Sequence, residues 1–208
     1  MEDVLNIYTR PYDPHHPVVC LDESSKQLVK ETIEPLGIKP GHPPAYDYHY
    51  QRNGVCNLFM MFEPLASWRH VSVTERRTKQ DYALQLKYLV DERYPDAEII
   101  TIVQDQLNTH VPSALYATFE PAEARRILDK LKFHYTPKHG SWLNMAEIEL
   151  SVLSSQCLER RIPDQQTLAP EIAAWEERRN QQFRTVNWQF TTADARIKLK
   201  RLYPSIQS

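Results

Sequence analysis

Two aspartates occupy equivalent places in the sequence, each near the end of a short apolar run. Asp22 follows Val18–Leu21, and Asp105 comes soon after Ile99–Val103. Such β-branched runs are typical of buried strands. Carboxylates that meet at neighbouring strand ends repel one another unless a cation neutralises them, and hard divalent ions prefer oxygen ligands. The pair therefore predicts a divalent-metal site.

A third acid is available in the helix expected to begin at Asn144, where Glu147 and Glu149 both occur. A helix turns about 100° per residue, so these two side chains point about 160° apart and only one can face the strand ends. Glu147 shares its side of the helix with small polar residues: Ser151, Ser154 and Ser155. Glu149 falls with residues expected on the solvent side: Gln156 and Glu159. Helical geometry therefore favours Glu147 as the third ligand.

Three such carboxylates suit reactions at phosphorus. Mg²⁺ keeps several waters, binds few carboxylates and shares phosphate oxygens with its substrate. A pair of such ions can hold the attacking and leaving oxygens of an in-line displacement. The residue pattern alone leaves one alternative open, because most acids near strand ends are solvated loop residues.

The loop expected over residues 136–143 lies beside the proposed site and carries a cation, an imidazole and an indole. These side chains are Lys138, His139 and Trp142. A lysine can contact phosphate, while Trp142 can stack on a base or pack against the protein, and packing is the commoner role of tryptophan. The loop is therefore a candidate DNA contact.

Several histidines and one asparagine are further candidates. Asn108 and His110 follow Asp105 closely, so both are candidate DNA contacts, with a structural role as the alternative for the histidine. The spacing of His134 and His139 resembles part of a zinc site, but no cysteine pair accompanies it. A zinc centre is therefore not expected.

The charge distribution adds a possible DNA-binding segment, although the net charge of −2 does not itself indicate a nucleic-acid partner. From residue 180 onward one aspartate, Asp194, is outnumbered by five cations: Arg184, Arg196, Lys198, Lys200 and Arg201. This local surplus suits a phosphate backbone. Arg196, Lys198 and Lys200 are the candidate contacts, with a solvated helix end as the alternative.

The elements that must position these residues begin with strands. Tyr46–Gln51 and Val55–Phe62 flank Arg52-Asn53-Gly54, and Asn-Gly between strand-like runs predicts a tight hairpin turn. Ser67–Val73 alternates and is expected to be the third strand of the same meander.

Helices and strands alternate after this meander. Helices are predicted over 78–94, ending at Pro95, over 112–131, with Pro121 starting a second helix, over 144–160, and from Asp164 onward. A short strand is expected over Lys132–Tyr135. A helical crossover between two apolar strands makes them parallel neighbours, which brings Asp22 and Asp105 to the same edge of the sheet.

Composition is that of an ordinary soluble globular protein, with 41% hydrophobic and 25% charged residues in 208. The expected division is an irregular lead-in over 1–16, an α/β catalytic domain over 17–161, and a C-terminal helical extension over 162–208 packed on the same domain. No secretory signal, membrane span or paired cysteine motif is evident, which favours a cytoplasmic protein with reduced thiols.

Three longer motifs resemble a known family. VVCLDESSKQL, VQDQLNTH and HYTPKHGSWLNMAEIELSVL are similar to the conserved blocks of DDE transposases in the bacterial branch of the Tc/mariner superfamily, the insertion-sequence family six-thirty. The similarity continues through RRIPDQQTL and TTADARIKLKRLYPSI, and so covers nearly the whole chain. The resemblance implies an RNase H-like mixed sheet, in which a three-strand meander and parallel strands are flanked by helices.

The resemblance also implies a function. It assigns Asp22, Asp105 and Glu147 as catalytic and metal ligands for two Mg²⁺ or Mn²⁺ ions, which serve cleavage at transposon inverted repeats and joining into TA target DNA. It further implies a homodimer or synaptic oligomer that acts at the bacterial nucleoid. Gln106, where the family usually has Asn, and Ser24-Ser25, where it usually has Met-Pro, depart from the family pattern.

Two alternatives to a complete transposase follow from the same residues. Family members carry helix-turn-helix domains that recognise transposon ends, and these are expected to be separate from this chain or missing. The chain could then be a catalytically silent remnant that binds DNA or oligomerises. A stand-alone RNase H-like nuclease would share the acidic site but would hydrolyse without strand transfer.

Overall fold

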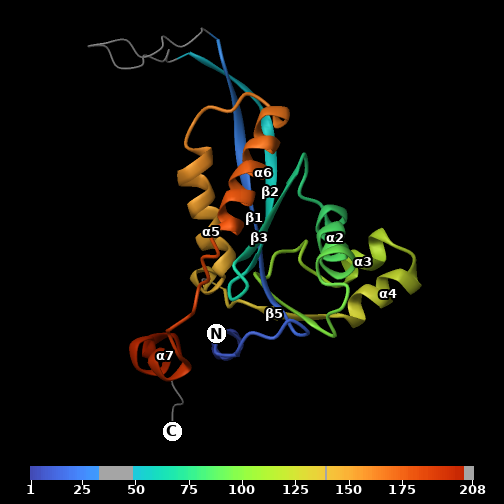
Figure 1. The fold of residues 1–208 in the computed structure, drawn as a ribbon, viewed down its shortest axis with the longest axis vertical. Coiled ribbons are helices and arrows are strands. Elements are labelled where there is room, and N and C mark those ends of the chain that lie inside the picture. Colours follow the sequence, from blue (N-terminus) through green and yellow to red (C-terminus); the bar gives the residue numbers. More distant parts are fainter. Residues whose placement is uncertain (33–48, 139, 204–208) are drawn as a thin grey trace.

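A five-stranded mixed sheet forms the centre of the computed structural model, with the strand order β3-β2-β1-β4-β5 (Figure 1). β1 (Val18–Glu31), β2 (Tyr50–Glu63) and β3 (Trp68–Thr74) form an antiparallel meander. β4 (Ile100–Gln104) and β5 (Leu131–Tyr135) continue the sheet in parallel with β1. The structure thus confirms a three-strand meander with added parallel strands, but the first strand of the meander is β1 and not the predicted Tyr46–Gln51.

The structure describes all residues except 33–48, 139 and 204–208. Its α-helices are α1 (Glu2–Tyr8), α2 (Lys79–Tyr88), α3 (Ser113–Thr118), α4 (Pro121–Asp129), α5 (Met145–Leu153), α6 (Gln165–Gln181) and α7 (Thr192–Lys198). Single π-helical segments, Leu89–Arg93 and Ser154–Leu158, extend α2 and α5, and short 3₁₀ turns lie at Ser141–Leu143 and Lys200–Leu202. None of the helices described is long and apolar enough to cross a membrane.

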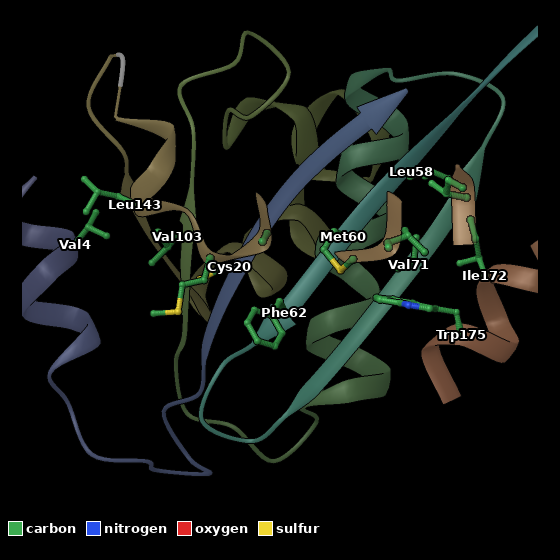
Figure 2. Packing of buried hydrophobic residues seen from close by; sticks show 14 of the residues in the cluster. Val4, Cys20, Leu58, Met60, Phe62, Val71, Val103, Leu143, Ile172 and Trp175 are labelled. Atoms are coloured by element: carbon green, nitrogen blue, oxygen red, sulfur yellow. The ribbon is translucent and has the colours of Figure 1, made fainter. Parts of the chain in front are cut away.

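Each face of the sheet buries its own apolar cluster, because successive side chains of a strand point to opposite faces. Met60 and Phe62 of β2 belong to the cluster that contains Trp175 of α6 (Figure 2). Phe59 and Met61 of the same strand belong to the second cluster, with residues of α2, α3 and α4. Helices α5 and α6 therefore cover one face, and α2, α3 and α4 cover the other (Figure 1).

The Asn53-Gly54 pair does not form the predicted hairpin turn. Both residues lie inside β2, where the register with β1 shifts between Gln27 and Val29. Two residues of β2 thus face one residue of β1, which is a β-bulge. Gly54 has φ +93°, so the bulge uses the same left-handed backbone that a tight turn requires. Residues 46–48 of the expected strand Tyr46–Gln51 lie outside the described residues, and its last two residues belong to β2.

The irregular lead-in predicted for residues 1–16 is wrong in its first half, where α1 forms. Val4, Leu5, Ile7 and Tyr8 of this helix are buried, and Val4 and Tyr8 belong to the cluster beneath α5 and α6. Tyr8 donates a hydrogen bond through Oη to the carbonyl oxygen of Leu143 (2.6 Å). Tertiary burial therefore stabilises a helix too short to be recognised from its pattern.

Helix α6, in the predicted C-terminal extension, packs on the sheet. Leu168, Ile172 and Trp175 of α6 are buried in the cluster with β2 and β3, and Trp175 donates through Nε1 to Oε1 of Gln156 (2.9 Å). The three cysteines are free thiols.

Candidate active site

Asp22 and Asp105 lie at matching positions beyond the parallel ladder of β1 and β4. The last pair of that ladder is Cys20 with Val103, and each acid follows its paired residue by two positions. Asp22 does not end its strand as predicted, because β1 runs on to Glu31 as the partner of β2. The parallel pairing nevertheless brings both acids to one edge of the sheet, as expected.

Asn144 joins the first acid to the helix that carries the third. Its Nδ2 donates to the carbonyl oxygen of Leu21 (2.9 Å) and to Oδ2 of Asp22 (3.2 Å). Its Oδ1 accepts from the backbone N–H of Ala146 (3.2 Å) and so caps α5. Glu147 then lies in the first turn of α5. Sequence reasoning recognised Asn144 as a helix start and missed its link to Asp22.

The charges of the other two predicted acids reach Asp22. Burial raises the pKa of Asp22 to about 7, opposed by a hydrogen bond from the backbone N–H of Glu23 and reinforced by the carboxylates of Asp105, Glu147 and Glu23. Asp105 and Glu147 thus act on Asp22, although one follows a strand and the other lies in a helix.

A divalent ion would offset the repulsion that helps to raise the pKa of Asp22, and carboxylate oxygens are suitable donors for it. Within the described part of the chain, no three His, Cys, Asp or Glu side chains converge on a single metal position. Mg²⁺ in such sites needs only one or two carboxylates, with water and substrate phosphate completing the shell. The donor set thus fits ions that are each held by few protein ligands.

His110, a predicted DNA contact, has a side chain without exposed surface and lies between two acids. Its Nδ1 lies 2.6 Å from Oδ1 of Asp105, and its Nε2 lies 2.6 Å from Oε2 of Glu23. Burial alone would lower the pKa of His110, but the carboxylates of Asp105 and Glu23 beside its two ring nitrogens outweigh it and raise that pKa to about 9. The hydrogen bond between His110 and Asp105 lowers the pKa of Asp105.

Glu149 is buried, and its predicted position on the solvent side is wrong. One carboxylate oxygen lies 3.0 Å from Nε of Arg69, and the other lies 2.8 Å from an Nη of Arg179. These arginines belong to β3 and α6, so the ion triad fastens α5 to both elements. A buried acid can be recognised only when its partners are known, and both partners are far from it in sequence.

The loop between β5 and α5 presents part of the predicted DNA-contact set. Lys138 is exposed, and Trp142 is 40% exposed. The indole of Trp142 stacks on that of Trp188, with ring centroids 6.3 Å apart, and meets Phe190 edge-on at 5.9 Å. The Trp142 indole therefore packs against Trp188 and Phe190, while part of its surface stays exposed to solvent. His139 lies outside the described residues.

The basic C-terminal segment approaches the same aromatic group. Nζ of Lys198 lies 5.6 Å from the centre of the Phe190 ring, which connects α7 to Trp142. Arg196 is engaged by Glu2 through two contacts of 2.8 Å, whereas Lys200 and Asn108 are exposed. Trp142 and Lys198 thus both contact Phe190.

Comparison with known proteins agrees with this architecture. The family model described as DDE superfamily endonuclease matches residues 17–169. A structure of the Mos1 mariner paired-end complex with Mn matches 88% of this chain and 54% of its own chain, with a TM-score of 0.59 and 18% identity. The Mos1 strand transfer complex matches 88% and 53%, with a TM-score of 0.58 and 16% identity.

These likenesses establish an RNase H-like transposase fold, and the chain spans about half the length of the solved transposase chains it matches. A comparison with curated protein sequences gave no match. The family match covers most of the chain and includes Asp22, Asp105 and Glu147. The protein therefore belongs to the DDE superfamily of endonucleases, which confirms the predicted relationship to DDE transposases.

Proposed function

We propose that this chain is the catalytic domain of a metal-dependent DNA transposase. It would cleave phosphodiesters at transposon ends and transfer the resulting 3′-OH into target DNA. The observation that carries the proposal is that Asp22 and Asp105 follow paired residues of β1 and β4 at one edge of a DDE-family sheet, where the charges of Asp105 and Glu147 reach Asp22. A two-metal nuclease uses acidic side chains of this kind to bind its cations.

Asp22, Asp105 and Glu147 are the proposed ligands of two Mg²⁺ or Mn²⁺ ions. Bound divalent ions supply activation of the attacking oxygen and stabilisation of the leaving oxygen at phosphorus. Asp105 contributes a carboxylate held ionised by His110. Asp22 must lose its proton before it can bind a cation, since its pKa is raised to about 7. Asn144 links Asp22 to the start of α5.

The proposed DNA surface lies beside this site. Lys138, Lys198 and Lys200 would contact phosphates, and Trp142 would stack on an exposed base. The support is the proximity of Trp142, Phe190 and Lys198 and the exposure of Lys138 and Lys200. Asn108 and Arg196 remain proposed contacts, although Arg196 must first leave Glu2.

The solved relatives suggest the assembly in which such a domain acts. They include Mos1 paired-end and strand transfer complexes. By analogy, this chain would bind inverted repeats and TA target DNA as a homodimer or larger synaptic oligomer, with end recognition by a helix-turn-helix region. A bacterial protein of this kind would act in the cytoplasm at the nucleoid.

Plasmid nicking tests the catalytic proposal. The 208-residue chain incubated with supercoiled plasmid and Mn²⁺ is expected to give nicked circles, and Asp105→Asn should reduce the rate by at least about 100-fold, because the metal ions supply several kcal/mol of transition-state stabilisation. Glu159→Gln, at an exposed position, is the matched control and should nick like the wild type.

The products separate the candidate functions. A transposase should also join the 3′-OH of a DNA duplex that carries the transposon inverted repeat to plasmid DNA. A stand-alone nuclease would only hydrolyse phosphodiesters of the plasmid. Equal nicking by wild type and Asp105→Asn, or none by either, would contradict catalysis at this site. DNA binding without cleavage would favour the silent remnant.

A further inference from the structure

One buried imidazole joins the two strands that carry the proposed metal ligands. Glu23 follows Asp22 on β1, and Asp105 follows β4. His110 lies 2.6 Å from an oxygen of each of Glu23 and Asp105. The histidine side chain has no exposed surface, and the Glu23 side chain is 2% exposed. We call these three residues the acid clamp.

The surroundings of the acid clamp hold the ring in place. The ring of Tyr82 lies 4.9 Å from that of His110. Tyr82 donates through Oη to Oε1 of Gln104 (2.8 Å), and Gln104 donates through Nε2 to the carbonyl oxygen of His110 (3.3 Å). Both the ring and its backbone are therefore fixed relative to β4. On the other side, Nε of Arg77 lies 3.8 Å from Oε1 of Glu23.

The contacts to Asp105 turn its carboxylate in a defined direction. Oδ1 of Asp105 hydrogen-bonds to Nδ1 of His110 (2.6 Å) and accepts from the backbone N–H of Leu107 (3.2 Å). The second oxygen, Oδ2, is then the one offered to a cation. The ring of His110 places a nitrogen beside each of Glu23 and Asp105, which a glutamine side chain does not do with donors, because its amide carries them on one atom only.

We propose that His110 is a positioning residue, which with Glu23 fixes the orientation of Asp105 and its distance from Asp22. This inference rests on the proposed metal-dependent function. It extends the functional set to two residues that do not touch DNA or metal. Hydrogen bonds to a ligating carboxylate from such outer residues commonly change metal affinity or activity by about 10–100-fold when removed.

Mn²⁺ binding by calorimetry on the full chain tests the acid clamp directly. His110→Gln is expected to weaken Mn²⁺ binding by about 10–100-fold and to slow plasmid nicking by a similar factor. The apparent KM for plasmid should stay unchanged, because the replaced side chain is buried. The direction of the change in Mn²⁺ affinity separates two effects. Loss of the positive charge of His110 would by itself strengthen Mn²⁺ binding, so weaker binding in the variant indicates that Asp105 is no longer held in position.

A second histidine–acid pair supplies the matched control. Nδ1 of His70 lies 3.0 Å from Oε1 of Glu176, and His70 belongs to β3 at the edge of the sheet. His70→Gln should bind Mn²⁺ like the wild type. Stronger or unchanged Mn²⁺ binding by folded His110→Gln would overturn the proposal. A wild-type chain that binds no Mn²⁺ would instead overturn the proposed function, and the clamp with it.

Two further measurements apply if His110→Gln does not fold. Glu23→Gln keeps the imidazole and removes only the anchoring charge, and it should weaken Mn²⁺ binding by about tenfold; wild-type binding by this variant would overturn the proposal. In the wild type, ¹⁵N NMR should show protons on both ring nitrogens of His110 in slow exchange with water. A ring with one bare nitrogen would overturn the bridging role.

Discussion

Asp22 carries an electrostatic penalty in the metal-free protein. Its carboxyl is partly buried and lies near three other carboxylates, so its pKa is raised to about 7. The unfolded chain releases this proton near pH 4. Between about pH 4 and pH 7 the folded protein therefore holds more protons than the unfolded chain, and this residue lowers the free energy of unfolding as pH rises.

Asp22→Asn is accordingly expected to stabilise the metal-free protein at high pH. The variant should equal the wild type near pH 4 and exceed its free energy of unfolding by about 1–3 kcal/mol at pH 8, allowing for partial exposure. Urea denaturation at several pH values, with EDTA present, measures the difference. If the difference in free energy of unfolding between Asp22→Asn and the wild type did not change with pH, the destabilising effect assigned to ionised Asp22 would be contradicted.

Asn144 has two functions that substitutions can separate. Asn144→Ser keeps a good helix cap but is too short to reach Leu21 and Asp22, whereas Asn144→Ala loses both functions. Loss of the cap should cost about 1 kcal/mol of stability in the alanine variant only. Both variants should nick plasmid more slowly than the wild type. Equal nicking by Asn144→Ser and wild type would show that the link to Asp22 is dispensable.

At the scale of elements, α5 is held against the sheet by charge as well as by apolar packing. Glu149 is buried with Arg69 of β3 and Arg179 of α6. Burial of charges is tolerated there because each has a partner of opposite sign. This attachment holds the helix that begins with Glu147.

Glu149→Gln should lower the free energy of unfolding by about 3–5 kcal/mol, because it leaves two buried cations without their anion. Urea denaturation monitored by tryptophan fluorescence checks the value. Glu159→Gln, an exposed position just beyond α5, is the control and should change stability by less than about 0.5 kcal/mol. A loss for Glu149→Gln no larger than that of the control would refute the role of the triad.

The β-bulge gives a second element-scale prediction. An added Cβ at Gly54 would meet no heavy atom within 4 Å, so only its φ of +93° opposes a side chain. Gly54→Ala should cost about 1 kcal/mol, and Gly54→Val more, since β-branched residues fit positive φ least. Gly54→Asn should cost less than Gly54→Ala. Thermal unfolding of the three variants checks the order, and equal midpoints would exclude backbone strain.

For the whole molecule, the parallel strands bring Asp22 and Asp105 to one edge of the sheet, while the C-terminal chain returns to the N-terminal helix. α7 lies next to α1 (Figure 1), and Lys198 contacts Phe190, which also meets Trp142. The proposed DNA contacts Trp142 and Lys198 are thus linked through one aromatic residue.

Salt dependence of DNA binding tests this surface. Each phosphate contact contributes a slope of about −0.9 to the plot of log affinity against log salt. Lys198→Ala and Lys200→Ala should each reduce the slope by about one and weaken binding similarly for all sequences. Arg196→Ala should change the slope less, because Glu2 already neutralises that guanidinium. Unchanged slopes for both lysine variants would remove α7 from the DNA surface.

Local patterns in the sequence were sufficient for the strands β3, β4 and β5 and the helices α2, α4 and α5, and they proposed Asp22, Asp105 and Glu147 as the acids of the site. Apolar periodicity, proline positions and helical geometry are properties of neighbouring residues, so they can be read from the chain itself. The family motifs then supplied the function that pattern alone left open.

Only the tertiary structure decided the roles of His110, Glu149 and the Asn53-Gly54 pair. The partners of Glu149 are 80 and 30 residues away, since 149 − 69 = 80 and 179 − 149 = 30. Glu23 and His110 meet only because β1 and β4 are parallel neighbours. A positive φ suits a turn and a bulge equally. The pairing of β2 with β1 determines that Asn53-Gly54 forms a bulge. Burial of a polar group depends on partners that folding brings together, and local sequence does not contain them.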